Sequence, residues 1–249
     1  MSASAYRERI GGVLGKIWAT QMGTIEKASA AMAETIANGG LVHLFGSGHS
    51  VLPVQDMFPR YGAYPGFHPL MDMRLMWTNV IGSGGAKGLL WLERKEGYAQ
   101  VLFENEPIRQ GDVMLVFSHG GLNAAGIEVL MEAKKRGLTT VGVTSLDNYR
   151  KREATHSSGK KLADVADIVI DNCTPAEDAL VPIEGWKAPV AAGSTVAFIT
   201  IAMAIIAQVA VNLAAKGLTP PVFVSPNVPG IPPDNTNRVY EEYERGLKR

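Results

Sequence analysis

Two short segments of the sequence combine glycine with hydroxyl and amide side chains, as anion-binding loops do. The first reads Gly46-Ser47-Gly48-His49-Ser50, and the second reads Ser118-His119-Gly120-Gly121-Leu122-Asn123. Glycine lets the backbone approach an oxyanion closely, and the N–H groups at the start of a helix attract negative charge. Each segment follows an apolar run and precedes a helical pattern, so together they predict a phosphate site. For either segment alone, a plain helix cap is the other interpretation.

A third segment, Gly193-Ser194-Thr195, places hydroxyl groups at the start of a long apolar helical pattern. We expect Ser194 and Thr195 to lie close to the same phosphate. The common nucleotide motifs do not fit, because Val51 stands where a dinucleotide fingerprint has its third glycine and the sequence has no Gly-Lys-Ser/Thr. Neither a dinucleotide site nor a P-loop is therefore expected.

Acid and base candidates are fewer than hydroxyl groups. His49 and His119 lie within the two glycine segments. His156 precedes a polar turn, from which a loop could bring it to the site; a loop cap is the other interpretation. Glu184, in the segment before the long apolar helix, is the preferred general base, and a solvated carboxylate is the alternative.

The remaining ionisable residues favour structural roles. Glu93 and Glu96 belong to a charge run that is typical of a solvated helix start. His43 and His68 lie in apolar runs and are expected to pack in the core. No spacing of His, Cys or carboxylate residues resembles a zinc site, so the sequence predicts no metal.

The elements that position these residues follow from hydrophobic periodicity. Apolar runs predict strands at 41–45, 66–71, 112–118, 138–144 and 166–171. Helical spacing predicts helices at 6–38, 98–104, 122–136, 194–216 and 235–249, with a Pro-rich strap before the last. Residues 112–144 form a strand, loop, helix and strand, which implies parallel strands, a right-handed crossover and an α/β fold.

Composition narrows the partners and the compartment. The 249 residues hold 24 basic and 24 acidic side chains, and this balance argues against nucleic acid. Cys173 is the single cysteine, so no disulfide can form within the chain and the cytoplasm is the expected location. Residues 188–207 carry no charge, but Pro189 and Gly193 interrupt them, so we expect a buried helix or a subunit interface and no membrane span.

The two glycine segments, together with 137–145, resemble the sugar isomerase (SIS) domain, whose usual strings are Gly-x-Gly-x-Ser and Ser-x-Ser-Gly-x-(Ser/Thr/Asn). Residues 155–162 and 165–173 resemble more specifically a bacterial branch of single-SIS-domain proteins that are often called phosphosugar or phosphoheptose isomerases. The resemblance extends from about Ile17 to Tyr243. Gly120 replaces the second usual serine, and Ala192-Gly193 replaces a frequent Pro-Thr.

The resemblance implies a three-layer αβα sandwich with a five-stranded parallel sheet of flavodoxin-like or Rossmann-like type. It implies one SIS domain over residues 1–249, and a homodimer or tetramer formed through helix 194–216. The ligand would be a sugar phosphate, held by Ser50, Ser118 and Asn123 with Ser47, Ser194 and Thr195 nearby.

The implied activity is cofactor-free aldose–ketose isomerisation through an enediol. A phosphosugar sensor without activity and an amino-sugar-phosphate lyase or deaminase are the alternatives. The missing hydroxyl at Gly120 motivates the sensor.

Overall fold

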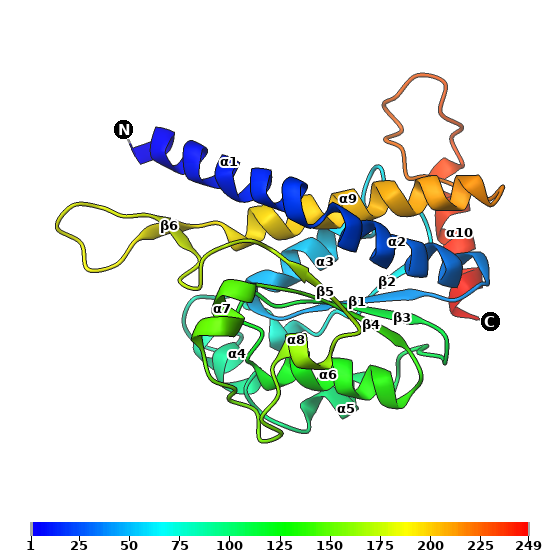
Figure 1. Ribbon diagram of the computed structural model, residues 1–249. Coiled ribbons are helices and arrows are strands. Elements are labelled where there is room, and N and C mark those ends of the chain that lie inside the picture. Colours follow the sequence, from blue (N-terminus) through cyan, green and yellow to red (C-terminus); the bar gives the residue numbers. More distant parts are fainter. Residues whose placement is uncertain (1, 249) are drawn as a thin grey trace.

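A five-stranded parallel sheet lies at the centre of the computed structural model, which describes residues 2–248 (Figure 1). Its strands are β1 (Val42–Gly46), β2 (Phe67–Pro69), β3 (Val113–Phe117), β4 (Thr139–Thr144) and β5 (Ile168–Asp171). They pair in the order β2-β1-β3-β4-β5. Successive strands are therefore added on one side of β1 for β2 and on the other side for β3, β4 and β5, and the strand order reverses between β1 and β3. Open α/β sheets bind ligands at the carboxyl ends of the strands, next to the point where the strand order reverses.

Helices cover both faces of the sheet, and this makes the three-layer sandwich that the sequence predicts. One face carries α1 (Ser2–Thr20), α2 (Met22–Ala37), α3 (Val51–Met57) and α9 (Ser194–Ala215). The other carries α4 (Ala86–Leu92), α5 (Tyr98–Phe103), α6 (Ala124–Lys135) and α8 (Leu162–Val165). Because both faces are covered, the strands read as continuous apolar runs, and every residue of β1 and β3 is buried.

Two segments of the chain differ from the sequence-based expectation. The single helix expected over 6–38 is two helices, α1 and α2, which meet at Gln21. The segment before α9 forms a hairpin of β6 (Ala179–Val181) and β7 (Val190–Ala192), which projects from the sheet as an arm (Figure 1). These strands have three residues each, too few for a periodicity to be recognised.

Helix α9 is long and apolar enough to span a membrane by length and composition. In the fold it packs against α2, α3 and the sheet, and Phe198, Ile201 and Ile205 are buried in the core. Of its most apolar 18-residue window, however, only 44% is buried within the chain. The helix is therefore a core element with a second apolar side that this chain alone leaves uncovered.

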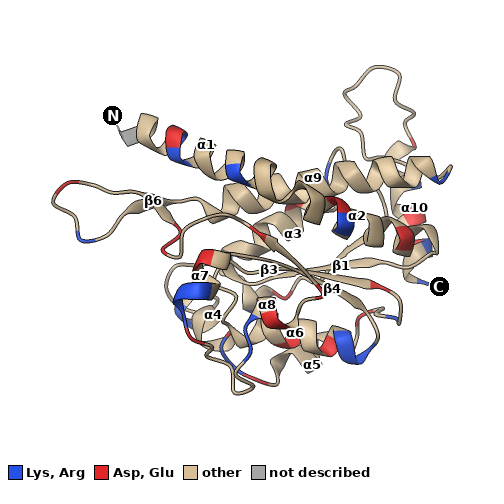
Figure 2. Cartoon of the chain, in the orientation of Figure 1, with Lys and Arg blue, Asp and Glu red and all other residues tan. Residues whose placement is uncertain are grey.

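The remaining elements surround the sheet. They are α7 (Leu146–Lys151), α10 (Asn235–Leu247) and two 3-10 turns, η1 (Gly48–Ser50) and η2 (Met73–Leu75). The Pro-rich segment loops outward before α10, and Tyr243 of α10 then packs on Phe58 with 5.0 Å between ring centroids. Charged residues of both signs are interspersed on the helices and loops around the sheet, in keeping with the zero net charge (Figure 2).

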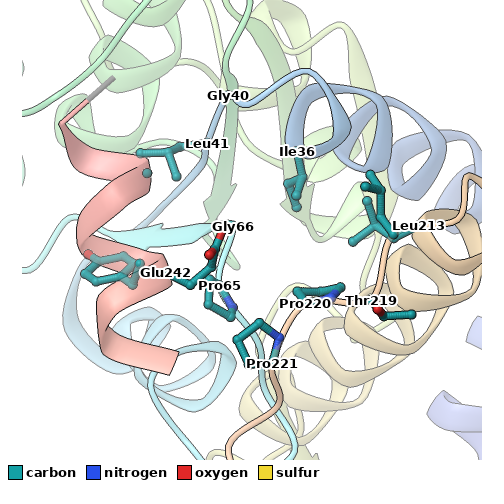
Figure 3. A pocket seen from close by; sticks show the side chains of 13 residues that line it. Ile36, Gly40, Leu41, Pro65, Gly66, Leu213, Thr219, Pro220, Pro221 and Glu242 are labelled. Carbon is teal, nitrogen blue, oxygen red and sulfur yellow. The ribbon is translucent and has the colours of Figure 1, made fainter. Parts of the chain in front are cut away.

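A cavity of about 260 Å³ lies where the strands begin. Leu41 and Gly66, which precede β1 and β2, line it together with Pro221 of the Pro-rich segment and Tyr243 of α10 (Figure 3). The predicted site lies at the opposite, carboxyl edge of the sheet. This cavity therefore lies between the beginning of the sheet and the C-terminal segments, and not at the predicted site.

A buried hydrogen bond between His43 and Asp112 joins β1 to the start of β3. Nε2 of His43 lies 2.8 Å from Oδ2 of Asp112, and the same carboxylate accepts the backbone N–H groups of Leu41 and Arg109. Burial raises the pKa of Asp112, but the hydrogen bonds from His43 and these N–H groups outweigh it and hold the pKa below 3.8. His43 is a packing residue, as expected, with a polar partner that its sequence context did not reveal.

Replacing Asp112 by Asn should lower the free energy of unfolding by about 2–3 kcal/mol, because the amide can no longer accept all three hydrogen bonds. Since the folded-state pKa is depressed, the loss should be complete above pH 3.8 and should shrink as the pH falls through that folded pKa. Urea unfolding from pH 3 to 7 measures it. Asp56→Asn, which removes an exposed pair with Arg60, is the control and should change stability by about 0.5 kcal/mol or less.

Candidate functional site

The two glycine segments lie side by side at the carboxyl edge of the sheet. Strands β1 and β3 pair in parallel with Gly46 opposite Phe117, so Ser47 and Ser118 begin neighbouring loops. This is the position at which the strand order reverses. The two polar loops therefore lie next to each other at one edge of the sheet, and their role in binding phosphate stays a prediction.

The loop after β1 needs its glycines. A Cβ on Gly46 would lie 2.0 Å from the carbonyl oxygen of Ser50, so only glycine allows the chain to fold back into η1. Gly48 has a φ of +59°, which side chains other than glycine adopt at a cost. In residues 2–248, the backbone N–H groups of Gly48 and His49 have no protein acceptor. The loop thus presents unpaired donors next to the hydroxyl groups of Ser47 and Ser50.

The loop after β3 is built in a similar way. Ser118 Oγ accepts the N–H of Gly121, whose φ of +61° brings it against Thr144. Within the described chain, no acceptor is present for the N–H groups of Gly120 and Asn123. Asn123 precedes α6, and its side chain does not cap that helix. A Cβ at Gly120 would meet nothing within 4 Å, so the fold does not require glycine there.

A buried carboxylate connects the two loops. Glu93 is only 5% exposed, and its Oε2 accepts a hydrogen bond of 2.8 Å from Ser47 Oγ. Burial raises the pKa of Glu93 above its ordinary value, and the hydrogen bond from Ser47, the nearby Arg94 and the neighbouring Asn123 of the second loop only partly offset this effect. Such a carboxylate takes up a proton at a higher pH than a solvated one.

Sequence reasoning missed Glu93, because the charge run around it suggested a solvated helix start. One signal was available: Glu93 follows Leu89 by four residues, so both lie on the same side of the helical turn. Leu89 is buried, and Glu93 is buried with it. The backbone adds a second restraint, since the carbonyl of Glu93 accepts the N–H of Ala125 in α6.

The histidines of the two loops are placed differently. His49 is exposed, and its ring packs edge-on against Trp77 at 4.5 Å between centroids. His119 turns toward the segment after β5: Nδ1 lies 3.2 Å from Asn172 Nδ2 and 3.1 Å from Thr174 Oγ1. Its Nε2 faces the carbonyl oxygen of Ala176. His119 is thus held by three groups of the loop after β5, whereas His49 is exposed.

In the third hydroxyl segment, a carboxylate of the same chain already accepts the hydrogen bonds that a ligand would need. Asp178 accepts the N–H groups of Gly193 and Ser194 and the hydroxyl of Ser194. A ligand at the start of α9 would have to displace this carboxylate. The prediction that Ser194 and Thr195 bind substrate stays a prediction.

Glu184 and His156 do not join the two loops in the way their sequence context suggested. Glu184 is exposed and lies in the arm between β6 and β7, which projects away from the carboxyl edge of the sheet within one chain (Figure 1). His156 is buried and faces the carboxylates of Glu96 and Glu128. Their catalytic roles stay predictions, and the structure offers Glu93 as the carboxylate nearest the loop hydroxyls.

Comparison with known proteins agrees with this architecture. A sequence model described as the SIS domain matches residues 5–145. A UPF0309 protein of Caldanaerobacter subterraneus subsp. tengcongensis is 34% identical over 246 residues, which cover 98% of each chain. A UPF0309 protein of Listeria innocua is 36% identical over 221 residues, 89% of this chain and 87% of the relative.

Solved structures share the fold at low sequence identity. A phosphoheptose isomerase from Francisella tularensis superposes with a TM-score of 0.52 at 18% identity and covers 83% of this chain and 95% of its own. A phosphoheptose isomerase from Neisseria gonorrhoeae gives a TM-score of 0.55 at 17% identity and covers 83% and 96%. Since the SIS model matches more than half of the sequence, and relatives above 30% identity extend along nearly all of it, the chain belongs to the SIS domain family and, within it, to the UPF0309 proteins.

Proposed function

We propose that this protein binds a sugar phosphate at the carboxyl ends of β1 and β3 and interconverts its aldose and ketose forms. The observation that carries the proposal is the buried Glu93, whose carboxylate accepts a hydrogen bond from Ser47 of one glycine loop and whose backbone carbonyl accepts the N–H of Ala125, just after the other loop. A base in this position lies beside the groups that would hold the phosphate. The phosphoheptose isomerases that share the fold support this choice of chemistry.

The phosphate is assigned to the unpaired donors of the two loops. The N–H groups of Gly48, His49, Gly120 and Asn123 have no acceptor in the described chain, and α6 directs its positive end toward the second loop. The hydroxyls of Ser50 and Ser118 complete the set. No lysine or arginine is needed, because several N–H groups and hydroxyls together satisfy the ester oxygens.

Glu93 is the proposed proton carrier. In aldose–ketose isomerisation, its carboxylate removes the proton from the carbon next to the carbonyl, and the C–H electrons form the double bond of the enediol while the carbonyl oxygen gains a proton. Glu93 then returns its proton to the neighbouring carbon as the other hydroxyl loses its own. A raised pKa suits this exchange, since a base works best when its pKa approaches the working pH. His49, which is exposed on the same loop, is the candidate acid at oxygen.

The assembly and the location are part of the same proposal. Helix α9 has an apolar side that this chain leaves uncovered, with Val211 61% exposed and Val196 38% exposed. A second copy packed on this side would bury it, and the projecting β6–β7 arm could then bring Glu184 to the partner's site. We propose a homo-oligomer in the cytoplasm, in line with the single cysteine.

One observation favours a binding function without turnover. Gly120 removes a hydroxyl that SIS phosphate loops usually carry, although the fold has room for one. A sensor would keep the phosphate contacts and would not need Glu93 as a base. The assays below separate the two functions.

The purified chain should convert at least one member of a panel of aldose and ketose phosphates, with uptake of solvent deuterium at the carbon next to the carbonyl. Proton NMR in D₂O measures both events in one experiment. Binding by calorimetry with neither turnover nor exchange would reject the isomerase and favour the sensor. Release of ammonia or a split carbon chain would instead indicate a deaminase or a lyase.

Glu93→Gln should lower kcat about 10²- to 10⁴-fold while leaving the affinity for the sugar phosphate within a few-fold, because the amide keeps the shape and loses the base. Steady-state kinetics together with calorimetry measure the two effects. Glu104→Gln, an exposed carboxylate on the same stretch of chain, is the matched control and should behave like the wild type. An unchanged kcat in Glu93→Gln would remove Glu93 from the mechanism.

The same variant should be at least as stable as the wild type near pH 7. Because the folded-state pKa of Glu93 is raised, the wild type loses stability as the pH rises from 4.5 through that pKa, and the Gln variant does not. Urea unfolding from pH 4 to 8 should therefore show the variant gaining relative stability with pH. A loss of stability at pH 7 would mean that the ionised carboxylate is structural.

Val211→Asp should shift the protein toward the monomer if α9 forms the subunit interface, because a charge in an apolar interface is costly. Light scattering after gel filtration measures the mass. Val228→Asp, which changes an exposed valine of the Pro-rich segment, is the control and should leave the mass unchanged. A monomeric wild type would contradict the proposed assembly.

A further inference from the structure

We propose that Glu96, Glu128 and His156 form a binding site for a divalent metal ion, and that this ion is Zn²⁺. One ligand atom from each residue lies within 4.8 Å of the others. His156 Nε2 is 3.5 Å from Glu128 Oε1 and 4.0 Å from Glu96 Oε2. The three residues come from the segment between α4 and α5, from α6, and from the loop after α7. They are therefore invisible to any search for local ligand spacing.

The imidazole of His156 supplies an independent reason to expect a ligand. The residue is 9% exposed, and its Nε2 is buried without a hydrogen-bond partner in the described chain. A buried polar atom left unsatisfied costs about 1–3 kcal/mol, so such atoms are rare in folded proteins. Here the atom faces two carboxylates at distances too long for a good hydrogen bond and suitable for a shared cation.

The two carboxylates are held in place by neighbouring backbone groups. The N–H of Gly97 lies 2.7 and 2.9 Å from the two oxygens of Glu128. Glu96 accepts the N–H of Ser157 at 2.7 Å and the Ser157 hydroxyl. Each carboxylate oxygen keeps a lone pair for a metal, and these outer hydrogen bonds orient the ligands as they do in known metal sites.

The geometry requires little rearrangement. In tetrahedral zinc sites with bonds of about 2.0–2.2 Å, ligand atoms lie about 3.3–3.5 Å apart, so the pair formed by His156 and Glu128 already fits. Glu96 Oε2 lies farther away, at 4.0 Å from His156 Nε2, and has to move slightly inward to complete the set. The exposure of Glu96 leaves a fourth position open to water.

Metal binding also selects the histidine tautomer. Zn²⁺ takes the lone pair of Nε2, which places the ring proton on Nδ1. Ser158 Oγ lies 2.8 Å from Nδ1 and can accept this N–H, whereas the backbone N–H of Ser158, which donates to Nδ1 at 3.1 Å, would lose its acceptor when the metal binds. One imidazole and two carboxylates suit Zn²⁺ better than Mg²⁺ or Ca²⁺, which prefer oxygen ligands alone.

The position of the cluster suggests what the ion would do. Glu96 follows Glu93 by three residues, and Glu128 lies on the helix that begins after Asn123. An ion at this place would fasten the segment carrying Glu93 to α6 and to the loop around His156. The metal would thus be structural, and its presence can be tested without any sugar phosphate.

The test uses the full chain with its affinity tag removed, stripped with EDTA and dialysed. Titration with ZnCl₂ in a calorimeter should give one site per chain, and Co²⁺ should give the visible absorption of a tetrahedral centre. Zn²⁺ should also raise the melting temperature, since it binds the folded chain. His156→Gln and Glu128→Gln should each weaken binding by at least about 100-fold, because each removes a ligand rather than an outer contact.

Glu132→Gln is the matched control, because it lies one turn beyond Glu128 on α6 and pairs only with Lys135. It should bind Zn²⁺ like the wild type. Equal binding by wild type and His156→Gln would place the zinc elsewhere and overturn the proposal. No binding by the wild type would also overturn it. Melting of each variant without metal shows whether it is folded.

Discussion

The hydrogen bond between Ser47 and the buried carboxylate of Glu93 connects the backbone framework to its candidate chemistry. Strand pairing alone brings the loops after β1 and β3 together, because parallel strands in register end at the same edge. It does not bring a base to them. The segment after α4 does so, and it is held there because the Glu93 carbonyl accepts an N–H of α6 and the Glu93 carboxylate accepts the hydroxyl of Ser47. The cost of burying that carboxylate appears as its raised pKa, which is also the property that a proton carrier needs.

The sequence was sufficient for the framework. The five strands, the parallel sheet and the helices around α6 and α9 follow from apolar periodicity, and both glycine loops were located by residue type. A hydroxyl or glycine residue at the end of a strand can be recognised from the neighbouring sequence, and its position in space follows from the order of the strands in the sheet. The assignment of one domain to residues 1–249 stays a prediction.

The acid and base residues could not be located in this way. Glu93, Asp178 and His156 owe their surroundings to contacts across the fold: Glu93 reaches back to Ser47, Asp178 turns onto the start of α9, and His156 meets two carboxylates from other elements. A carboxylate in a charge run and one in a buried site look alike in sequence. Only burial separates them, and burial here depends on segments 31 to 46 residues apart. The break at Gln21 and the short strands of the arm were not predicted for a simpler reason. Helical periodicity continues on both sides of Gln21, and strands of three residues are too short to show an alternating pattern.

Gly120 has a consequence for the shape of the bound molecule. Its backbone does not need glycine, and apart from its two chain neighbours no atom of residues 2–248 lies within 4 Å of where a Cβ would stand. A serine there would contribute a hydroxyl, but it would also take up space beside the ester. At the proposed site, the free volume replaces one polar contact with space, so the proposed ligand would carry a larger or differently oriented group at that position than a pocket lined by serine would admit.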